Sequence, residues 1–439
     1  LNSWDLDQPM NTWEGVTLND SGEVVALSLT ANNLNGTIPN LNLPELLTLA
    51  MNGNRLKGNI PILNRLRKLA FFDLSNNELD GSIPDFQFPE LTSLRLQSNQ
   101  LAGAVPDFTG IRKVTSVNLS NNLLSEDIPD FSNMPGLFVL RIGNNRFEGL
   151  LPDFSGFPGL LELDVSNNRL IGGIPELGNL TSLFILKVAN NDFTGFLPDF
   201  RRLDVLEQLD VSGNRFSGPT PLFSALRSLQ QLNISNNDLD GPLPDLVFNT
   251  ELTVFNASGN SFDGEIPAYN TLENLQVLDL SNNELIDTLP DLSHLEELSE
   301  LHIDSNFLVH SNLDLAATPQ LRVVSAEYNY FTFSDLDDLN GSSLGALFEY
   351  APQRRIIMPD TIFATIRDDV IFDLDIDDGI ANSRYQWYKD DVFLQALELN
   401  RLVLVNINAL DVGTYYALVR NDAWPALSRS GFTRNWPSC

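Results

Sequence analysis

The sequence predicts an α/β solenoid of stacked coils, followed by a smaller all-β sandwich. Two observations lead to this prediction. One pattern of leucine, asparagine, glycine and proline recurs fourteen times at a spacing of 22 or 23 residues, and regular periods of this length are typical of solenoids. After about residue 347 the pattern ends, and short runs with a period of two follow, which are typical of β-strands.

Each copy reads L-x-L-x-x-N-x-L-x-G-x-I-P, as in the segment that begins at Leu163. The alternation of Leu163 and Val165 predicts a short strand with one apolar face. Asn168 follows, where the chain must turn and expose backbone groups inside the coil. Because its side chain carries both a donor and an acceptor, it can satisfy those groups. The equivalent anchor residues are Asn32, Asn54, Asn77, Asn99, Asn122, Asn145, Asn168, Asn191, Asn214, Asn237, Asn260, Asn283, Asn306 and Asn329.

The repeat resembles the plant-type leucine-rich repeat, whose consensus continues through G-x-I-P, over roughly residues 24–333. The resemblance implies a curved solenoid with a parallel β-sheet on its concave face. We call the outward side of these strands the sheet face. At about 4.8 Å per strand, its length is on the order of 65 Å, the size of a protein-binding surface. We therefore expect a solenoid with a C-terminal cap over residues 27–346.

Residues 1–26 resemble the N-terminal cap of plant-type leucine-rich-repeat proteins, through Trp4, Trp13 and the segment Gly22-Glu23-Val24. The two cap cysteines of that pattern are absent, and Met10 and Thr17 stand at or beside their places. We expect the packing of the two tryptophans to hold the cap instead. The departure suggests a bacterial secreted relative rather than a plant receptor.

Residues 347–439 contain five strand-like runs, and two motifs among them are specific. Tyr385-Gln386-Trp387-Tyr388-Lys389-Asp390 and Asp411-Val412-Gly413-Thr414-Tyr415-Tyr416-Ala417 resemble strand C and the tyrosine corner of immunoglobulin-like domains. The resemblance implies that Trp387 is the core tryptophan and Tyr415 the corner tyrosine, with Ala417 in place of a cysteine. Such a pairing of domains resembles large surface proteins of Gram-negative bacteria. The expected strands are 355–358, 370–376, 384–389, 401–407 and 414–420.

The composition restricts the partners and gives little information about the compartment. The 26 basic and 58 acidic residues leave a net charge of −32, which argues against nucleic acid and anionic membranes because their phosphates would be repelled. The single cysteine, Cys439, allows no disulfide within the chain. The chain lacks an initial Met and a long apolar run. We interpret it as part of a longer exported product, extracellular or at the bacterial cell surface, whose signal and anchor lie elsewhere.

The candidate partner-binding residues lie in the middle of the sheet face, mainly four residues before the anchors. Basic and acidic side chains alternate there, and arginines that directly follow three anchors extend the set. We expect this strip to bind an extracellular protein or peptide of mixed charge. The alternative is that the charges pair across neighbouring strands and keep the face soluble. The residues are Arg95, Asn118, Arg141, Asp164, Lys187, Asp210, Arg146, Arg169 and Arg215.

Other chemistries are weaker candidates. Among the positions six, four and two before the anchors, Phe71 is the only aromatic residue, so a sugar-stacking site on this face is less favoured than a protein site. Three carboxylates share the face, but a glycosidase also needs a cleft, and we expect no enzyme and no cofactor. The segment Asp373–Gly379 resembles a calcium loop with its glycine one residue late. A strand with a solvated acidic face is the preferred interpretation, and incidental calcium the alternative.

A second motif, Pro-Asp-Phe, recurs between the strands, for example at residues 152–154. Its aspartates suggest either a calcium ladder or caps of short turns, and we expect caps. For the whole chain we expect a non-catalytic recognition or adhesion protein. A structural role in a surface layer, filament or larger surface complex is the second hypothesis, and carbohydrate binding is the third.

Overall fold

The computed structural model describes residues 7–314, 317–332, 335, 347–351, 353, 362–374, 383–421 and 430–435. The chain divides into two compact units. The first comprises residues 1–239 and 244–252, and the second comprises residues 240–243 and 253–439. The chain forms a β-solenoid with a parallel sheet, followed by small antiparallel sheets, which confirms the predicted fold class.

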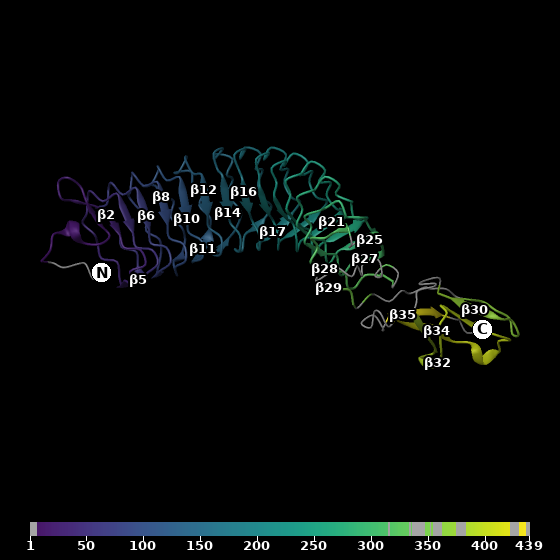
Figure 1. The fold of residues 1–439 in the computed structure, drawn as a ribbon. Helices are drawn as coiled ribbons and strands as arrows, with labels where there is room; N and C mark the ends of the chain where they lie inside the picture. Colours follow the sequence, from purple (N-terminus) through teal and green to yellow (C-terminus); the bar gives the residue numbers. More distant parts are fainter. Residues whose placement is uncertain are drawn as a thin grey trace. The chain divides into compact units, whose positions relative to one another are not determined.

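One strand from each coil forms the main sheet (Figure 1). Its strands are parallel except for β1, which pairs with β2 in antiparallel fashion. In the central strands β12, β14 and β16, the middle residue points into the core while its neighbours point outward. In the first unit the strands are β1 (Val16–Leu18), β2 (Val24–Ser28), β4 (Thr48–Ala50), β6 (Phe71–Asp73), β8 (Ser93–Arg95), β10 (Ser116–Asn118), β12 (Val139–Arg141), β14 (Glu162–Asp164), β16 (Ile185–Lys187), β18 (Gln208–Asp210) and β20 (Gln231–Asn233).

The second unit contains the same kind of strand. Its parallel strands are β22 (Val254–Asn256), β24 (Val277–Asp279), β26 (Glu300–His302), β28 (Val323–Ser325) and β29 (Leu347–Glu349).

The anchor asparagines link successive coils as predicted. The Asn168 amide nitrogen donates to the carbonyl oxygens of Val165 in its own coil, at 2.9 Å, and of Ile142 in the preceding coil, at 3.2 Å. Its amide oxygen accepts from the backbone N–H of Phe147, at 3.0 Å. The same arrangement recurs at Asn191. The turn therefore leaves few buried backbone groups without a partner.

The residue before each anchor has a left-handed backbone, which explains a second feature of the repeat. Asn167 has a φ of 55° and Asn190 a φ of 53°, and glycine replaces asparagine at Gly213, with a φ of 61°. Asparagine and glycine tolerate this conformation better than other residues. The doubled asparagine of the sequence therefore combines a turn residue with an anchor.

A second set of short strands follows the anchors from Asn32 to Asn306, and the sequence interpretation missed it. These strands pair from coil to coil into three side sheets. The first contains β3 (Asn35–Gly36), β5 (Arg55–Asn59) and β7 (Glu78–Asp80), and the second β9 (Ala102–Gly103), β11 (Leu123–Asp127) and β13 (Arg146–Glu148). The third contains β15 (Ile171–Gly172), β17 (Asp192–Gly195), β19 (Arg215–Gly218), β21 (Asp238–Pro242), β23 (Ser261–Gly264), β25 (Glu284–Leu289) and β27 (Phe307–Ser311).

The segments that lead into the main strands are turns rather than α-helices in the described coils, so the solenoid is built from β-structure. Their Pro-Asp-Phe motifs act as expected for caps. The Asp153 carboxylate accepts the backbone N–H of Ser155 at 2.7 Å, and Phe154 is buried at 1% exposure. The equivalent hydrogen bond from Ser132 lowers the pKa of Asp130.

The main sheet continues beyond the last copy of the sequence repeat. Strand β29 pairs in parallel with β28, so it belongs to the main sheet. Gln353 then takes the anchor position. Its amide oxygen accepts from the N–H groups of Asn329, at 3.1 Å, and Phe331, at 3.3 Å, and its nitrogen donates to the carbonyl of Ala326 at 2.8 Å. Because this coil has glutamine instead of asparagine at the anchor position, the sequence repeat did not identify it. Of the expected C-terminal cap, only Asp335 lies within the described residues.

The C-terminal region contains two antiparallel sheets. Trp387 and Tyr415 are 1% exposed, and the Phe372 ring stacks on Tyr415 with a centroid distance of 4.6 Å. The Tyr415 hydroxyl donates to the Asp411 carbonyl at 2.6 Å. One sheet contains β30 (Val370–Asp373) and β33 (Arg401–Leu404), and the other β32 (Val392–Leu397), β31 (Ser383–Lys389), β34 (Thr414–Asn421) and β35 (Ser430–Asn435).

Several predictions for this region differ from the structure or lie outside it. Strand β32 was not predicted. Strand β33 ends at Leu404, because Asn406 adopts a left-handed φ of 56°. The expected strand 355–358, residues 375–379 of the calcium-loop motif, and Cys439 lie outside the described residues.

The N-terminal cap holds η1 (Met10–Thr12) and β1. Gly15 is required there, because it has a φ of 80° and an added Cβ would lie 2.5 Å from the Ser28 carbonyl oxygen. Trp13 is half-buried, and Trp4 lies outside the described residues.

Candidate functional site

The structure brings the predicted central residues together on neighbouring strands of the first unit. Asn118 lies opposite Arg141, Arg141 opposite Asp164, and Asp164 opposite Lys187 in the strand register. Asp210 follows beside Lys187. The outward side chains of β12, β14, β16 and β18 therefore form one continuous row.

Arg141 is paired, but its partner is not the residue directly opposite. Its guanidinium donates two hydrogen bonds to the Glu162 carboxylate in the next coil, at 2.6 and 2.5 Å. These bonds and the charge of Glu162 raise the pKa of Arg141. Bidentate geometry holds both side chains in place. Arg141 therefore follows the alternative interpretation, in which charges on neighbouring strands pair with each other. Its partner is Glu162, although Asp164 lies directly opposite in the strand register.

The acidic and amide residues of the row take part in turns within their own coils. Asp164 Oδ1 accepts the backbone N–H of Ser166 at 3.0 Å and its hydroxyl at 2.6 Å. Asp210 and Asn118 accept from Ser212 and Ser120 in the same way. One side-chain oxygen of each of these three residues is thus occupied by the fold.

The two other basic residues of the row differ from each other. The Arg95 guanidinium lies 5.1 Å from the centroid of the Phe71 ring and 4.0 Å from the Asp73 carboxylate. Lys187 is half-buried, and it forms no ion pair within the part of the chain that the structure describes. Lys187 is therefore the cation of the row with its charge available to a partner.

The arginines that follow the anchors lie beyond the asparagine turn. Arg146 and Arg215 begin the side strands β13 and β19, and Arg169 lies two residues before β15. Arg215 also pairs with Asp192 in the preceding coil, at 2.6 Å. These three residues lie in or just before the side strands and not in the row on the main sheet.

An apolar edge beside the row was missed. Phe138, Leu161 and Phe184 occupy the same position in three successive coils, directly before their main strands, and are 46%, 43% and 42% exposed. Backbone hydrogen bonds of 2.8 and 2.9 Å join the three residues in sequence. Strict alternation along a strand would turn this position inward. The strand begins one residue later, and the turn before it directs these side chains outward.

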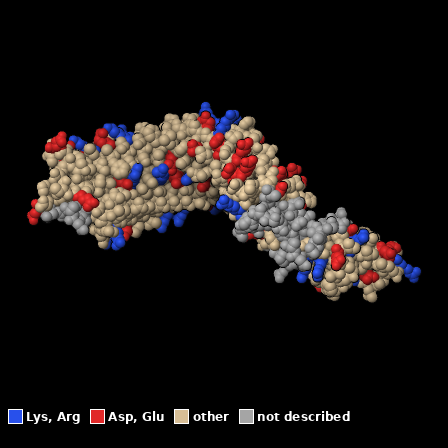
Figure 2. Space-filling model, in the orientation of Figure 1, with Lys and Arg blue, Asp and Glu red and all other residues tan. Residues whose placement is uncertain are grey.

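We define the central patch as Phe138, Leu161, Phe184, Arg141, Glu162 and Lys187. All six residues belong to the first unit. Figure 2 shows basic and acidic side chains intermingled over the middle of this unit, on a surface formed largely by uncharged residues. Large apolar groups next to charged groups are suited to binding a peptide or protein rather than to chemical transformation.

Within the described ranges, no group of three or more His, Cys, Asp or Glu side chains is placed to hold a metal ion. His302 contacts the Ser325 hydroxyl and His310 the Asp335 carboxylate, so the two histidines have separate local partners. No helix among the described residues has both the length and the hydropathy of a membrane span.

Comparisons with known proteins agree with the repeat architecture. Models of the leucine-rich repeat match residues 159–180 and 228–249, and a model of two such repeats matches residues 250–294. No curated protein matches the chain. The solenoid is thus a leucine-rich-repeat solenoid.

Solved structures of receptor ectodomains are similar to the chain. The GASSHO1/SCHENGEN3 ectodomain from Arabidopsis thaliana, in complex with CASPARIAN STRIP INTEGRITY FACTOR 2, is 31% identical with a TM-score of 0.66. The match covers 74% of this chain and 40% of that ectodomain, so the chain spans less than half of its length. The HAESA ectodomain from Arabidopsis, in complex with an extended IDA peptide hormone, is 26% identical with a TM-score of 0.58, and the match covers 80% and 74% of the two chains.

A bacterial structure shares the fold. A leucine-rich-repeat protein of Leptospira interrogans is 24% identical with a TM-score of 0.56, and the match covers 70% of this chain and 84% of that protein.

Proposed function

We propose that the protein is a non-catalytic recognition or adhesion protein that binds a peptide or protein partner through the central patch of the sheet face. The observation that carries this proposal is the apolar edge of Phe138, Leu161 and Phe184 beside Lys187. Surface apolar groups that are aligned over several coils are typical of interaction sites. The peptide hormone in the HAESA complex supports a peptide as the partner class.

The chemistry of the patch describes the partner. Its apolar side chains would cover the edge of Phe138, Leu161 and Phe184, because apolar burial supplies most of the free energy of association. An acidic side chain would face Lys187, since opposite charges across an interface set specificity and register. The Arg141–Glu162 pair would act as a polar rim, because its charges already satisfy each other. We therefore expect an extended segment with alternating apolar and acidic residues.

A peptide-display selection on the folded protein, followed by calorimetric titration of the selected peptide, tests this proposal. Phe184→Ala should weaken binding about tenfold, the size expected for a central apolar contact. Lys187→Glu should weaken it by a similar factor through charge reversal. Lys187 is a better target than Arg141, whose reversal would place a second carboxylate against Glu162 and disturb the fold.

The chain offers matched controls for both variants. Phe196 belongs to the same coil as Phe184 and is 73% exposed, but it follows the side strand β17. Lys57 is an exposed lysine in the side strand β5. Phe196→Ala and Lys57→Glu should leave the affinity unchanged. Equal losses in control and test variants would refute the central patch as the binding site.

A structural role in a larger surface assembly is the second candidate, and strand β32 favours it. Among the described strands, β32 lies at the edge of the four-stranded sheet, and Val392 and Phe393 are 65% and 51% exposed. Exposed apolar edge strands pair with other chains. Concentration-dependent self-association that Phe393→Lys abolishes would support this role over peptide recognition.

We further infer that the C-terminal sheets form an immunoglobulin-like domain without a disulfide, which acts as a spacer. The buried Trp387, the hydrogen bond of Tyr415 to Asp411 and the two antiparallel sheets support this inference. We propose that the protein works outside the cell or at a bacterial surface. Fractionation of the source cells tests the location, and recovery with the cytosol would contradict it.

A further inference from the structure

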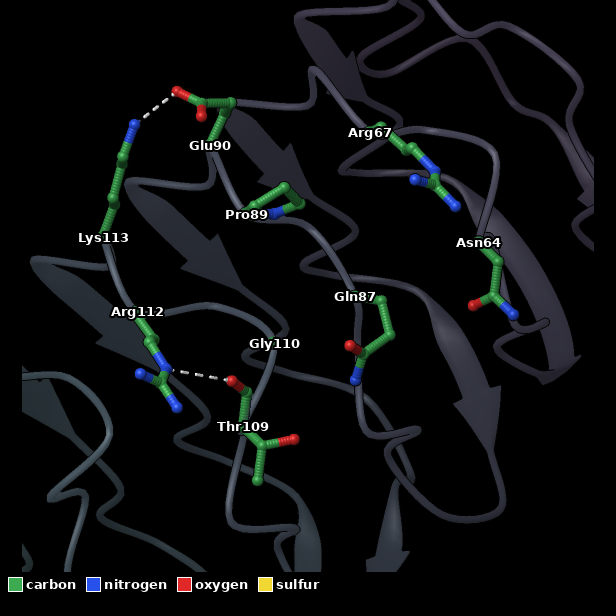
Figure 3. Close-up of a pocket in the computed structure, with 9 residues that line it drawn as sticks. All are labelled: Asn64, Arg67, Gln87, Pro89, Glu90, Thr109, Gly110, Arg112 and Lys113. Atoms are coloured by element: carbon green, nitrogen blue, oxygen red, sulfur yellow. Dashed lines mark hydrogen bonds and ion pairs between the residues drawn. The ribbon is translucent and has the colours of Figure 1, made fainter.

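A surface hollow of about 670 Å³ lies among the segments that lead into β6, β8 and β10 (Figure 3). Its residues belong to the first unit but to other coils than the central patch. The hollow therefore concerns a second site, which is independent of the proposed peptide binding.

The hollow results from one short side chain between two long ones. Arg67, Pro89 and Arg112 occupy equivalent places in three successive coils, each ten residues before its anchor. At about 4.8 Å per coil, the backbones that carry the two arginines are roughly 10 Å apart. Gly110 permits the close stacking below the hollow, because an added Cβ would lie 2.4 Å from the Phe86 carbonyl oxygen.

Among the described residues, no carboxylate pairs with either guanidinium group of the hollow. Neither Arg67 nor Arg112 forms an ion pair with any residue that the structure describes, whereas Lys113 beside them pairs with Glu90 at 2.7 Å. Within the described chain, the Arg112 Nε–H donates to the Thr109 carbonyl at 3.5 Å, and its terminal nitrogens remain available. Planar guanidinium groups favour carboxylates, which they can bind with two parallel hydrogen bonds. The two arginines therefore make the hollow locally basic, in contrast to the net charge of −32 that disfavours nucleic acid and anionic membranes.

The other side chains of the hollow suit hydroxyl groups. Gln87 lies between the two arginines and Asn64 lies beside Arg67 (Figure 3). Each amide offers a donor and an acceptor, as a sugar hydroxyl requires. Apart from Gly110, Pro89 is the one apolar residue of the lining.

We propose that this hollow binds an acidic oligosaccharide whose carboxylates lie on alternate sugar residues. One carboxylate contacts Arg67 and the next contacts Arg112, while hydroxyl groups between them contact Gln87 and Asn64. The spacing of two coils selects alternate rather than adjacent charges, and the amides distinguish a sugar from a simple anion.

Calorimetric titration of the whole chain with a hexasaccharide of alternating glucuronate and N-acetylglucosamine tests this proposal. Arg67→Gln and Arg112→Gln should each weaken binding about tenfold, through the loss of charge-assisted hydrogen bonds. Arg65→Gln is the matched control, because Arg65 is also exposed in the same segment and does not line the hollow. Its affinity should equal that of the native protein, and all three variants should keep the native melting temperature.

Three results would overturn the proposal. The first is an absence of binding at millimolar hexasaccharide. The second is an equal loss in Arg65→Gln, which would indicate general attraction by charge. The third is equally tight binding of either of two other probes. A hexaglutamate peptide would make the hollow a peptide site, and an uncharged N-acetylglucosamine hexasaccharide would show that the carboxylates are not recognised. Phe184→Ala should leave hexasaccharide binding unchanged, so failure of this proposal is distinguishable from failure of the peptide site.

Discussion

The coils of the solenoid and the C-terminal antiparallel sheets are stabilised in different ways. In the coils, an anchor such as Asn168 repeats the same hydrogen bonds from one turn to the next. In the C-terminal sheets, a few large aromatic groups, Trp387, Tyr415 and Phe372, occupy the centre of the core. A repeat distributes its stability over many equivalent contacts. The small C-terminal sheets depend on a few large aromatic side chains instead. Substitutions should therefore act locally in the coils and across the whole of the C-terminal sheets.

The largest effect is expected from Trp387→Ala. Loss of this buried ring should destabilise the C-terminal sheets by about 3–5 kcal/mol, through lost burial and the cavity left behind. Hydrogen exchange measured by mass spectrometry should accelerate in β31 and β34, while β12 and β14 exchange as before. Unchanged exchange in β31 would show that Trp387 does not organise this core.

Asn168→Ala should have the next largest effect, about 1–3 kcal/mol. The substitution leaves the Phe147 N–H and the Ile142 carbonyl without their side-chain partner. Exchange should accelerate in the two adjoining coils and decline to native values further away. Asn167→Gly is the control, because glycine accepts the left-handed backbone at that position. Uniform acceleration over the first unit would contradict the local character of the coils.

Gln353→Ala should cost about 1 kcal/mol, less than Asn168→Ala, because this anchor has a coil on one side in the described structure. The N–H groups of Asn329 and Phe331 lose their acceptor, so their exchange should accelerate. Gln353→Asn places the usual anchor amide on a shorter side chain and should retain part of the protection. If the alanine variant kept the native protection against hydrogen exchange, Gln353 would not act as an anchor.

Tyr415→Phe should have the smallest effect, about 1 kcal/mol, from loss of the hydrogen bond to Asp411. Burial, together with the charges of Asp411 and Asp390, raises the pKa of Tyr415 from 10.0 to about 12. The unfolded chain releases this proton near pH 10 while the folded chain retains it. Stability should therefore fall as the pH rises between these two values. Chemical denaturation across this range should show a smaller fall in the phenylalanine variant.

The repeat could be predicted from the sequence because each of its parts has a local cause. An apolar alternation produces a strand and an amide satisfies a turn, as Leu163 and Asn168 do. The last coil was missed because Gln353 supplies the same amide from another residue type. The side strands were missed because they contain few apolar residues and depend on pairing with the next coil, as β15 does with β17.

The candidate site was predicted in part. The positions of Arg141, Asp164 and Lys187 on one face followed from the register of the repeat. The pairing of Arg141 with Glu162 depends on how far a long side chain reaches diagonally to the adjacent strand, which the register does not specify. The exposure of Phe138 and Phe184 depends on the residue at which the strand begins, and one residue's difference reverses the direction of a side chain.

The sequence by itself determined the coils, their anchors and the row of charges on the main sheet. The reason is that residues at the same repeat position lie side by side on neighbouring strands. Only the tertiary structure decided which charges are paired, which apolar side chains stay exposed and where a hollow opens between Arg67 and Arg112. These properties depend on distances between side chains of different coils, and a sequence pattern contains no such distances.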